Sequence, residues 1–444
     1  MPSFSTHPHA TTTGPGWARP RPALPRLGVA ATVLALAVPL AGVSASAAPG
    51  DGPAPGLGRH EVRVATFNAS LNRFSAGELT ADVSAPGDPQ AAAVAEVVQR
   101  VRPDVLLLNE FDYVAPTVPG DAFSSPPVAG FVDNYLAVGQ GGAEPVHYPY
   151  AYVAPSNTGV PSGLDLNQDG AVGGPDDAWG FGTFPGQYGM LVLSRYPIDA
   201  EGVRTFQLFR WTDMPGARLP DDPTTPQPAD FWPAEIAGQV RLSSKSHWDV
   251  PVRVGSRTVH LLASHPTPPV FDGPEDRNGR RNADEIRFWD DYVTPGAAGY
   301  LYDDQGRTDG LAPGTRFVIA GDLNSDPLDG DSVPGATDQL LDNPRVSTAV
   351  TPTSTGAVEA TRLQGGANLT HRSDPAADTA DFADGAPGNL RADYVLPSRN
   401  LRTVGAGVFW PEAGEPLSRL TGTFPFPSSD HRLVWVDLVV AGRP

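Results

Sequence analysis

The chain of 444 residues carries 50 acidic and 31 basic residues, which gives a formal net charge of −19. A chain this acidic is poorly suited to hold nucleic acid by general electrostatic attraction, although a pocket that meets phosphate through metal ions stays allowed. Because the chain has no cysteine, disulfide scaffolds, thiolate zinc sites and cysteine nucleophiles are excluded. Hydrophobic residues make up 40% of the chain, which is enough for a large core and excludes wholesale disorder.

Residues 1–47 have the order of a secretory signal peptide. A Pro-rich segment that ends at Arg26 is followed by an apolar run, Leu27–Val43, and then by small residues. We expect cleavage after Ala47 or Ala48. The alternative is a membrane anchor, which is disfavoured because the apolar run spans only about 17 residues and contains a proline.

Cleavage would remove three arginines and no acidic residue, so the formal net charge would change from −19 to −22. Residues 48–60 are rich in Gly and Pro and predict a flexible leader. We therefore expect a secreted, monomeric protein without a stable membrane anchor.

Five short apolar runs along the rest of the chain each adjoin a polar residue with catalytic potential. The runs and their polar residues are Val62–Phe67 with Asn68, Val105–Leu108 with Asn109 and Glu110, His260–Ser264 with His265, Phe317–Gly321 with Asp322, and Tyr394–Leu396 with Asp393. Runs of this length and composition predict buried strands.

Helical segments separate some of these strands. Residues 91–101 have apolar side chains at helical spacing, and Pro103 ends the pattern. Residues 285–292 are a second predicted helix. The alternation of strands and helices predicts an α/β fold.

Strands fix their terminal residues rigidly, so several strand ends at one rim of a sheet can build a site. Any one of these polar residues could simply cap a strand, but several carboxylate, amide and imidazole endings together favour a site. Asp430 and His431, which precede a final apolar strand, add a carboxylate and a second imidazole.

The motifs in this order resemble the endonuclease/exonuclease/phosphatase superfamily. They are Ala65-Thr66-Phe67-Asn68, Leu107-Leu108-Asn109-Glu110, Ala263-Ser264-His265, Gly321-Asp322-Leu323-Asn324, Ala392-Asp393-Tyr394 and Ser429-Asp430-His431. The resemblance implies a four-layer α/β/β/α sandwich, DNase I-like, over residues 61–441, and divalent-metal-dependent hydrolysis of a phosphate ester.

The chain departs from the family pattern in two respects. Residues 266–269 are Pro-Thr-Pro-Pro, where many members continue with a leucine, and residues 112–185 and 206–243 are predicted to be long insertions. Both features should border the cleft, so analogy alone leaves the substrate open.

A catalyst for this reaction must neutralise charge and orient a water for in-line attack. Mg²⁺ or Mn²⁺ would supply the first function, and both prefer oxygen ligands. We expect Glu110 to be a metal ligand, Asn68 to be a neutral ligand or its partner, and Asp430 to be a further ligand.

The expected catalytic residues are His265, Asp322, Asn324, Asp393 and His431. Asp322 would orient or deprotonate the water, and Asn324 would donate to a phosphoryl oxygen. His431 would contact the phosphate or act as the base, with Asp393 fixing its ring, and His265 would supply a second donor. The identity of the base stays open between Asp322 and His431.

Several cations are candidates for substrate binding. Arg277, Arg280 and Arg281 could meet phosphate oxygens, or could be a solvated helix start paired with nearby acidic residues. Lys245 and His247 could also line the cleft, or could belong to an ordinary strand face.

The segment from Asp165 to Asp176 resembles an EF-hand-type calcium loop, because it has the pattern Asp-x-Asn-x-Asp-Gly with an acid at position 12. The expected ligands of a structural Ca²⁺ are Asp165, Asn167, Asp169 and Asp176. The alternative is an acidic surface turn that binds nothing tightly.

The favoured function is that of a secreted metal-dependent phosphoesterase acting on nucleic acid, a phospholipid headgroup or a small organophosphate. Monoesters and diesters are not distinguished. One alternative is a non-catalytic, calcium-stabilised binding module that retains the fold, but it predicts the loss of a catalytic residue. A two-carboxylate glycosidase would not need the histidines and the asparagine.

Overall fold

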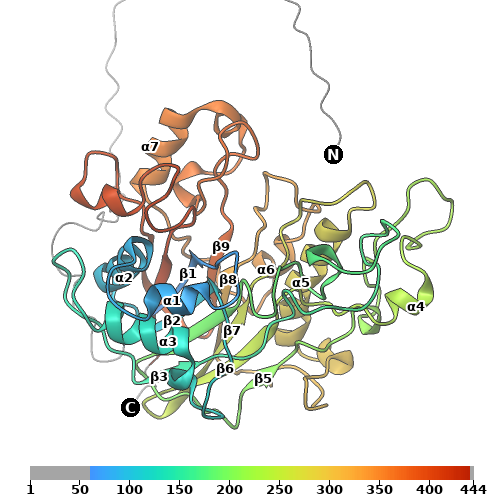
Figure 1. Cartoon of the computed structure of the whole chain (residues 1–444), viewed down its shortest axis with the longest axis horizontal. Coiled ribbons are helices and arrows are strands. Elements are labelled where there is room, and N and C mark those ends of the chain that lie inside the picture. Colours follow the sequence, from blue (N-terminus) through green and yellow to red (C-terminus); the bar gives the residue numbers. More distant parts are fainter. Residues whose placement is uncertain (1–60, 441–444) are drawn as a thin grey trace, which may run out of the picture. The chain divides into compact units, whose positions relative to one another are not determined.

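The computed structural model describes residues 61–440, in which two β-sheets pack face to face between two layers of helices (Figure 1). One sheet has the strand order β10-β11-β1-β2-β4-β3 and the other has the order β5-β6-β7-β8-β9. The strands are β1 (Glu61–Leu71), β2 (Val105–Phe111), β3 (Tyr150–Tyr152), β4 (Met190–Ser194), β5 (Arg204–Thr205), β6 (His247–Val254), β7 (Arg257–Ser264), β8 (Phe317–Asp322), β9 (Asp393–Pro397), β10 (Arg402–Val408) and β11 (Val434–Val439).

Within residues 61–440, seven α-helices flank the sheets, together with short 3₁₀ and π turns. They are α1 (Glu78–Val83), α2 (Pro89–Val101), α3 (Pro126–Phe131), α4 (Ala234–Ala237), α5 (Arg277–Val293), α6 (Asp338–Leu341) and α7 (Thr355–Gln364). Figure 1 shows α1, α2 and α3 on one side of the strands and α5 and α6 on the other. The predicted four-layer fold is confirmed.

The central strands read as continuous apolar runs because both of their faces are buried. In β2, Leu106 and Leu108 pack under α1–α3, whereas Val105 and Leu107 face the opposite sheet. The middle of the sandwich is thus formed by alternate residues of both sheets, and each outer layer of helices buries the remaining face.

The two predicted helices are present, and both are longer than expected. Helix α2 begins at Pro89, where the Asp88 side chain accepts a hydrogen bond from the Ala91 amide. It ends at Val101, and the next residue, Arg102, has a left-handed backbone conformation. Helix α5 begins at Arg277, eight residues before the expected start. Its first two turns carry the basic stretch that gave no apolar periodicity.

Strand pairing brings the polar strand ends to one rim. Strands β1 and β2 are parallel with Asn68 opposite Asn109, and β8 and β9 are antiparallel with Asp322 opposite Asp393. Parallel strands end at the same edge of a sheet, and an antiparallel neighbour begins there. Residues that are hundreds of positions apart in the sequence therefore meet.

The two predicted insertions have different structures. Residues 112–185 contain α3 and contribute β3, an edge strand that pairs with β4, whereas residues 206–243 form a long loop with the short helix α4. The predicted signal peptide and the leader, residues 1–60, lie outside the described residues. Among the helices that the structure describes, none is both long enough and apolar enough to span a membrane.

Candidate active site

The side chain of Asp322 is the point where both sheets and both imidazoles meet. Its Oδ2 atom accepts a hydrogen bond from Asn68 Nδ2 at 3.0 Å. The same oxygen lies 3.4 Å from His265 Nε2 and 3.6 Å from His431 Nε2. All four side chains are buried, so these groups interact in a medium of low dielectric.

The buried side chain of Asn109 holds the backbone of Asp322 in place. The Asp322 amide donates to Asn109 Oδ1 at 3.1 Å, while Asn109 Nδ2 donates to the Ser264 carbonyl at 3.3 Å. Asn109 thereby ties β2 of one sheet to β7 and β8 of the other. The close approach of β8 to the Ser264 carbonyl of β7 requires glycine at position 321. A Cβ there would lie 2.0 Å from that carbonyl oxygen.

His431 is oriented by a chain of hydrogen bonds. Its Nδ1 atom lies 2.8 Å from Asp393 Oδ2, and the hydroxyl of Thr379 donates to the same carboxylate oxygen at 2.8 Å. The ring of Phe382 packs edge-on against the imidazole at 5.3 Å. The Nε2 atom is left to face Asp322, as in a carboxylate–imidazole pair of a hydrolase.

Burial by itself would lower the pKa of His431, but the carboxylates of Asp393 and Asp322 outweigh it and raise that pKa well above 6.5. Burial would likewise raise the pKa of Asp322, yet the charge of His431 and the hydrogen bond from His265 lower it. The two groups are therefore an imidazolium and a carboxylate near neutral pH.

His265 has a different charge state. Burial, reinforced by the nearby Lys245 ammonium, lowers its pKa to about 4. Its Nδ1 atom is buried and has no hydrogen-bond partner within the described part of the chain. A neutral imidazole can donate a hydrogen bond from one ring nitrogen and accept one at the other.

Glu110 and Asp430 form an acidic pair beside this cluster. Burial and the charge of Asp430 both raise the pKa of Glu110, because the two carboxylates repel one another. Glu110 has a φ of 57°, an uncommon value for a residue with a side chain, and its carboxylate accepts a hydrogen bond from Asn72. Asp430 accepts a hydrogen bond from the Ser70 hydroxyl at 3.2 Å.

The donor set of Glu110, Asp430 and Asn68 fits a hard divalent cation, since it offers carboxylate and amide oxygens and its like charges are mutually repulsive. A second grouping, Asp322, Asp393 and His431, has ligand atoms within 4.8 Å of one another. The hydrogen bond between His431 and Asp393 already occupies that grouping, so we interpret it as an acid–base relay.

Asn324 follows Asp322 in a left-handed backbone conformation, with a φ of 51°. The backbone amide of Asn324 donates a hydrogen bond to Asp322 Oδ1, and the side-chain Nδ2 donates to the Pro266 carbonyl at 3.1 Å. The Pro-rich segment after His265, where the chain departs from the family pattern, is thus attached directly to the loop that carries Asn324.

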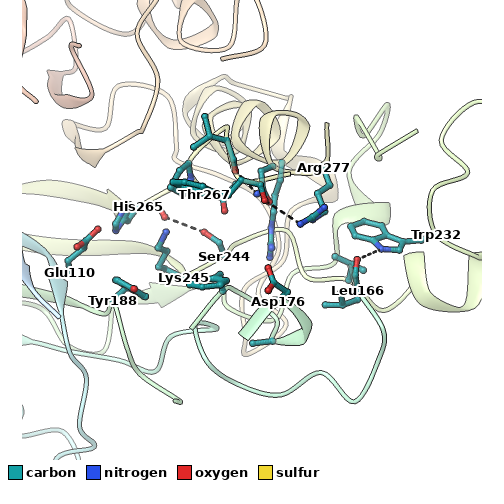
Figure 2. Close-up of a pocket in the computed structure, with 18 residues that line it drawn as sticks. Glu110, Leu166, Asp176, Tyr188, Trp232, Ser244, Lys245, His265, Thr267 and Arg277 are labelled. Carbon is teal, nitrogen blue, oxygen red and sulfur yellow. Dashed lines mark hydrogen bonds between the residues drawn. The ribbon is translucent and has the colours of Figure 1, made fainter. Parts of the chain in front are cut away.

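A cavity of about 540 Å³ opens from this cluster. Figure 2 shows Glu110, Lys245 and His265 at one end of the cavity and Leu166 and Trp232 at the other. Both predicted insertions contribute to its wall, as expected for segments that border the cleft.

The candidate substrate-binding residues separate into two groups. Lys245, Arg277 and Arg281 line the cavity. Arg280 is not among the residues that line it, and donates instead to the Leu219 carbonyl at 3.0 Å.

His247 is also absent from the cavity wall. It lies under α5, where its ring packs on Phe288 and Trp289 and its Nε2 is 2.8 Å from the Glu285 carbonyl oxygen. The expectation that His247 lines the cleft is therefore not met, because the first residue of β6 directs its side chain into the core.

The candidate calcium loop is a closed turn. The Asp165 carboxylate accepts hydrogen bonds from the amides of Asp169 and Gly170, and Asn167 Oδ1 also accepts one from the Asp169 amide. Asp177 closes the far side by accepting from the amides of Leu166 and Gly173. The predicted ligand at position 12, Asp176, is also one of the residues that line the cavity.

Three residues that support the site were not predicted to belong to it. Asn109 lies beside Glu110 at the end of an apolar run and was given no role, although its position was a usable signal. Thr379 and Asn72 occur in loops without any pattern, and only the folded chain shows that they contact Asp393 and Glu110.

The sequence of residues 65–431 matches the Endonuclease/Exonuclease/phosphatase family, and the chain belongs to that family. Members of the family are hydrolases of phosphate esters. No curated protein matches the sequence.

Several solved structures are similar to this chain. An endonuclease/exonuclease/phosphatase from Beutenbergia cavernae is 19% identical, with a TM-score of 0.46, over 87% of this chain and 73% of its own. A family protein from Leptotrichia buccalis is 12% identical, with a TM-score of 0.41, over 84% and 98%. Sphingomyelinase C from Streptomyces griseocarneus is 14% identical, with a TM-score of 0.39, over 85% and 99%.

Proposed function

We propose that this protein is a secreted, divalent-metal-dependent phosphoesterase that hydrolyses phosphodiester or phosphomonoester bonds by in-line attack of an activated water. Membership of a family of phosphate-ester hydrolases supports the reaction class. The observation that carries the proposal is the convergence of Asn68, His265 and His431 on one oxygen of Asp322.

Glu110, Asp430 and Asn68 would hold the cation, which we propose to be Mg²⁺ or Mn²⁺. When bound, the cation neutralises the phosphate charge and stabilises the negative charge that develops on the transferred oxygens. The repulsion between Glu110 and Asp430 supports this assignment, because a cation between them would relieve it.

The remaining residues would position the phosphate and the water. His431, held as an imidazolium by Asp393, would donate from Nε2 to a phosphoryl oxygen. Asp322, whose pKa is lowered, would accept a hydrogen bond from the attacking water and orient it. Neutral His265 and the Asn324 amide would donate to the phosphoryl or leaving oxygen, and the choice of base stays between Asp322 and His431.

The charge states favour Asp322 as the group that orients the water and His431 as the donor, since an imidazolium cannot accept a proton. A neutral His431 could instead accept the proton of the attacking water and act as the base. The pH dependence of turnover distinguishes these assignments.

The proposal includes export and a structural Ca²⁺. Export rests on the basic, apolar and small-residue order of residues 1–47. Calcium rests on the loop that carries Asp165, Asn167, Asp169 and Asp176. The alternative, a binding module without activity, is disfavoured because every predicted catalytic side chain is present.

The test is a substrate screen on the purified mature protein. Plasmid DNA, RNA, bis-p-nitrophenyl phosphate, p-nitrophenyl phosphate, phytate and sphingomyelin would each be supplied with Mg²⁺, Mn²⁺ or Ca²⁺. Hydrolysis of at least one ester, lost in His431→Ala, is the expected result. Complete inactivity on every ester with every ion would refute the proposal and favour the binding module.

A further inference from the structure

The wall of the cavity beside Glu110 is mostly apolar. Leu166, Ala178, Trp232 and Val240 come from the two insertions, and Pro268 and Val270 come from the segment after His265. A cavity of about 540 Å³ has the size of sites that hold small organic molecules. Its lining therefore matches an organic group more closely than a sugar or a second phosphate.

Most polar side chains in the wall already have partners inside the protein. Arg281 donates three hydrogen bonds to the carbonyls of Leu242, Trp179 and Arg241. Asn278 Nδ2 donates to the Val270 carbonyl at 2.7 Å. These groups are committed to holding the loops, so their hydrogen bonds are not free for a polar ligand.

Lys245 is a buried cation of the wall that lacks such a partner within the described residues. Its side chain lines the cavity and the residue is only 6% exposed, yet its ammonium has no hydrogen bond or ion pair within residues 61–440. The charges of Glu285, Glu110 and Asp322 act on it from a distance. A buried ammonium without a direct partner is costly unless an anion pairs with it.

Glu285 fixes the position of Lys245 relative to His265. One carboxylate oxygen accepts from the Ser244 amide and the other accepts from the Thr267 amide, both at 2.6 Å. The backbone beside Lys245 and the backbone beyond His265 are therefore held by the same side chain. The ammonium stands where the cavity joins the acidic and imidazole cluster (Figure 2).

Two phenylalanines with large exposed surfaces lie on the wall of the same cavity. Phe271 is 84% exposed and Phe181 is 54% exposed. Large apolar side chains that face water next to an apolar cavity mark a binding site, because a ligand in the cavity would cover them.

We propose that this cavity takes the apolar organic group of a small phosphate ester, while the Lys245 ammonium pairs with the phosphate. The inference rests on the proposed function and names the substrate class of the same site. Apolar contact would select the ester group, and the charge would direct the phosphate toward Glu110 and His265.

The experiment is calorimetry of the full protein with Mg²⁺ and two unreactive ligands, methylphosphonate and 1-naphthylmethylphosphonate. We expect the naphthyl compound to bind about tenfold more tightly or better, because its ring buries apolar surface. Phe271→Ala should reduce this preference by about threefold, and Phe424→Ala should leave it unchanged. Phe424 is a matched control because it is 85% exposed and is not among the residues of the cavity wall.

Lys245→Met separates the two halves of the proposal. Methionine has a similar length and removes a buried charge, so the variant should fold, and its affinity for both ligands should fall by the same factor with the preference retained. Equal affinities of the wild type for both ligands, or an unchanged preference in Phe271→Ala, would overturn the inference.

Hydrolysis of bis-p-nitrophenyl phosphate is measured in parallel, so that the two proposals fail separately. If the protein hydrolyses bis-p-nitrophenyl phosphate but binds both phosphonates with equal affinity, the proposed function is retained. The inferred substrate class is then refuted. If the protein hydrolyses no ester in the screen but still binds the naphthyl compound more tightly, the proposed function is refuted. The cavity then remains a binding site for an apolar group.

Discussion

Asp393 Oδ2 lies 2.8 Å from His431 Nδ1, and this contact holds the imidazole with its other nitrogen toward Asp322. The carboxylate is fully buried and is held in turn by Thr379. The charge of Asp393 therefore fixes both the orientation of the ring and its protonation.

Asp393→Asn should reduce turnover about a hundredfold or more, because the ring loses its charged partner. The pKa of His431 is raised chiefly by carboxylates, so loss of the Asp393 charge should also lower that pKa. If the imidazolium is the active form, activity falls as the pH rises through the His431 pKa. A pH profile of kcat/KM should then show its alkaline limb shifted to lower pH in the variant. An unshifted limb would separate Asp393 from the titration of His431.

His431→Ala, His265→Ala, Asp322→Asn and Asn324→Ala should each reduce kcat about a hundredfold or more with the fold retained, which is the usual effect of losing one positioned group. Circular dichroism checks the fold, and steady-state kinetics on the best substrate of the screen gives kcat. Arg280→Ala is a control, because Arg280 lies outside the cavity wall. Near-native turnover in His431→Ala would exclude His431 from the site.

Removal of divalent ions should abolish hydrolysis, and Mg²⁺ or Mn²⁺ should restore it. Glu110→Gln removes one ligand charge and should raise the Mg²⁺ concentration needed for half-maximal activity about tenfold or more. The measurement is activity against free Mg²⁺ after treatment with EDTA. Full activity in excess chelator, with no metal found by elemental analysis, would falsify the metal-dependent mechanism.

His247 predicts a pH dependence of stability that is independent of activity. Burial lowers its pKa to about 4 in the folded chain, whereas the unfolded value is about 6.5. Between these values the unfolded chain takes up a proton that the folded chain does not, so the free energy of unfolding falls as the pH falls from about 6.5 to about 4. Above pH 6.5 both forms are neutral and the contribution is absent.

The expected loss across that window is about 3 kcal/mol for this one group. His247→Gln should be less stable at pH 7 but should lose less stability between pH 7 and pH 4 than the wild type. Urea unfolding at several pH values measures both quantities. Identical pH dependence in the two proteins would show that His247 does not contribute.

Ca²⁺ should raise the melting temperature of the wild type and leave that of an Asp165→Ala, Asp169→Ala double variant unchanged. The carboxylates of Asp165 and Asp169 accept hydrogen bonds from backbone amides of the loop. The loop is therefore already folded into a turn, and its carboxylates would need to move little to bind Ca²⁺. Differential scanning calorimetry with and without Ca²⁺ is the measurement. An equal rise in both proteins would place the calcium elsewhere.

The sequence predicted the sandwich and several members of the central cluster because those residues adjoin short, buried apolar runs. A strand that is buried on both faces is recognisable by composition, and the residue that follows it is fixed at the rim of the sheet. Asn68, Asp322 and Asp393 were found in this way, and the structure brings them together.

Other residues were beyond such reasoning. His247 is the first residue of β6, but the direction of its side chain depends on which face of the sheet α5 covers. Thr379 contacts Asp393 from a loop whose path is determined by the whole fold. Spacing along the sequence carries no information on either relationship.

Lys245 is the only lysine in the chain, and it stands in the wall of the cavity. Reductive methylation with ¹³C-formaldehyde would therefore place a spectroscopic label on one side-chain nitrogen, with the terminal amine as the only other target. The chemical shift of that single dimethylamine would report the arrival of each phosphonate or metal ion without crowding from other lysines. The same amine would be the sole side-chain target of an acylating reagent, so protection from labelling would measure cavity occupancy in an unfractionated mixture.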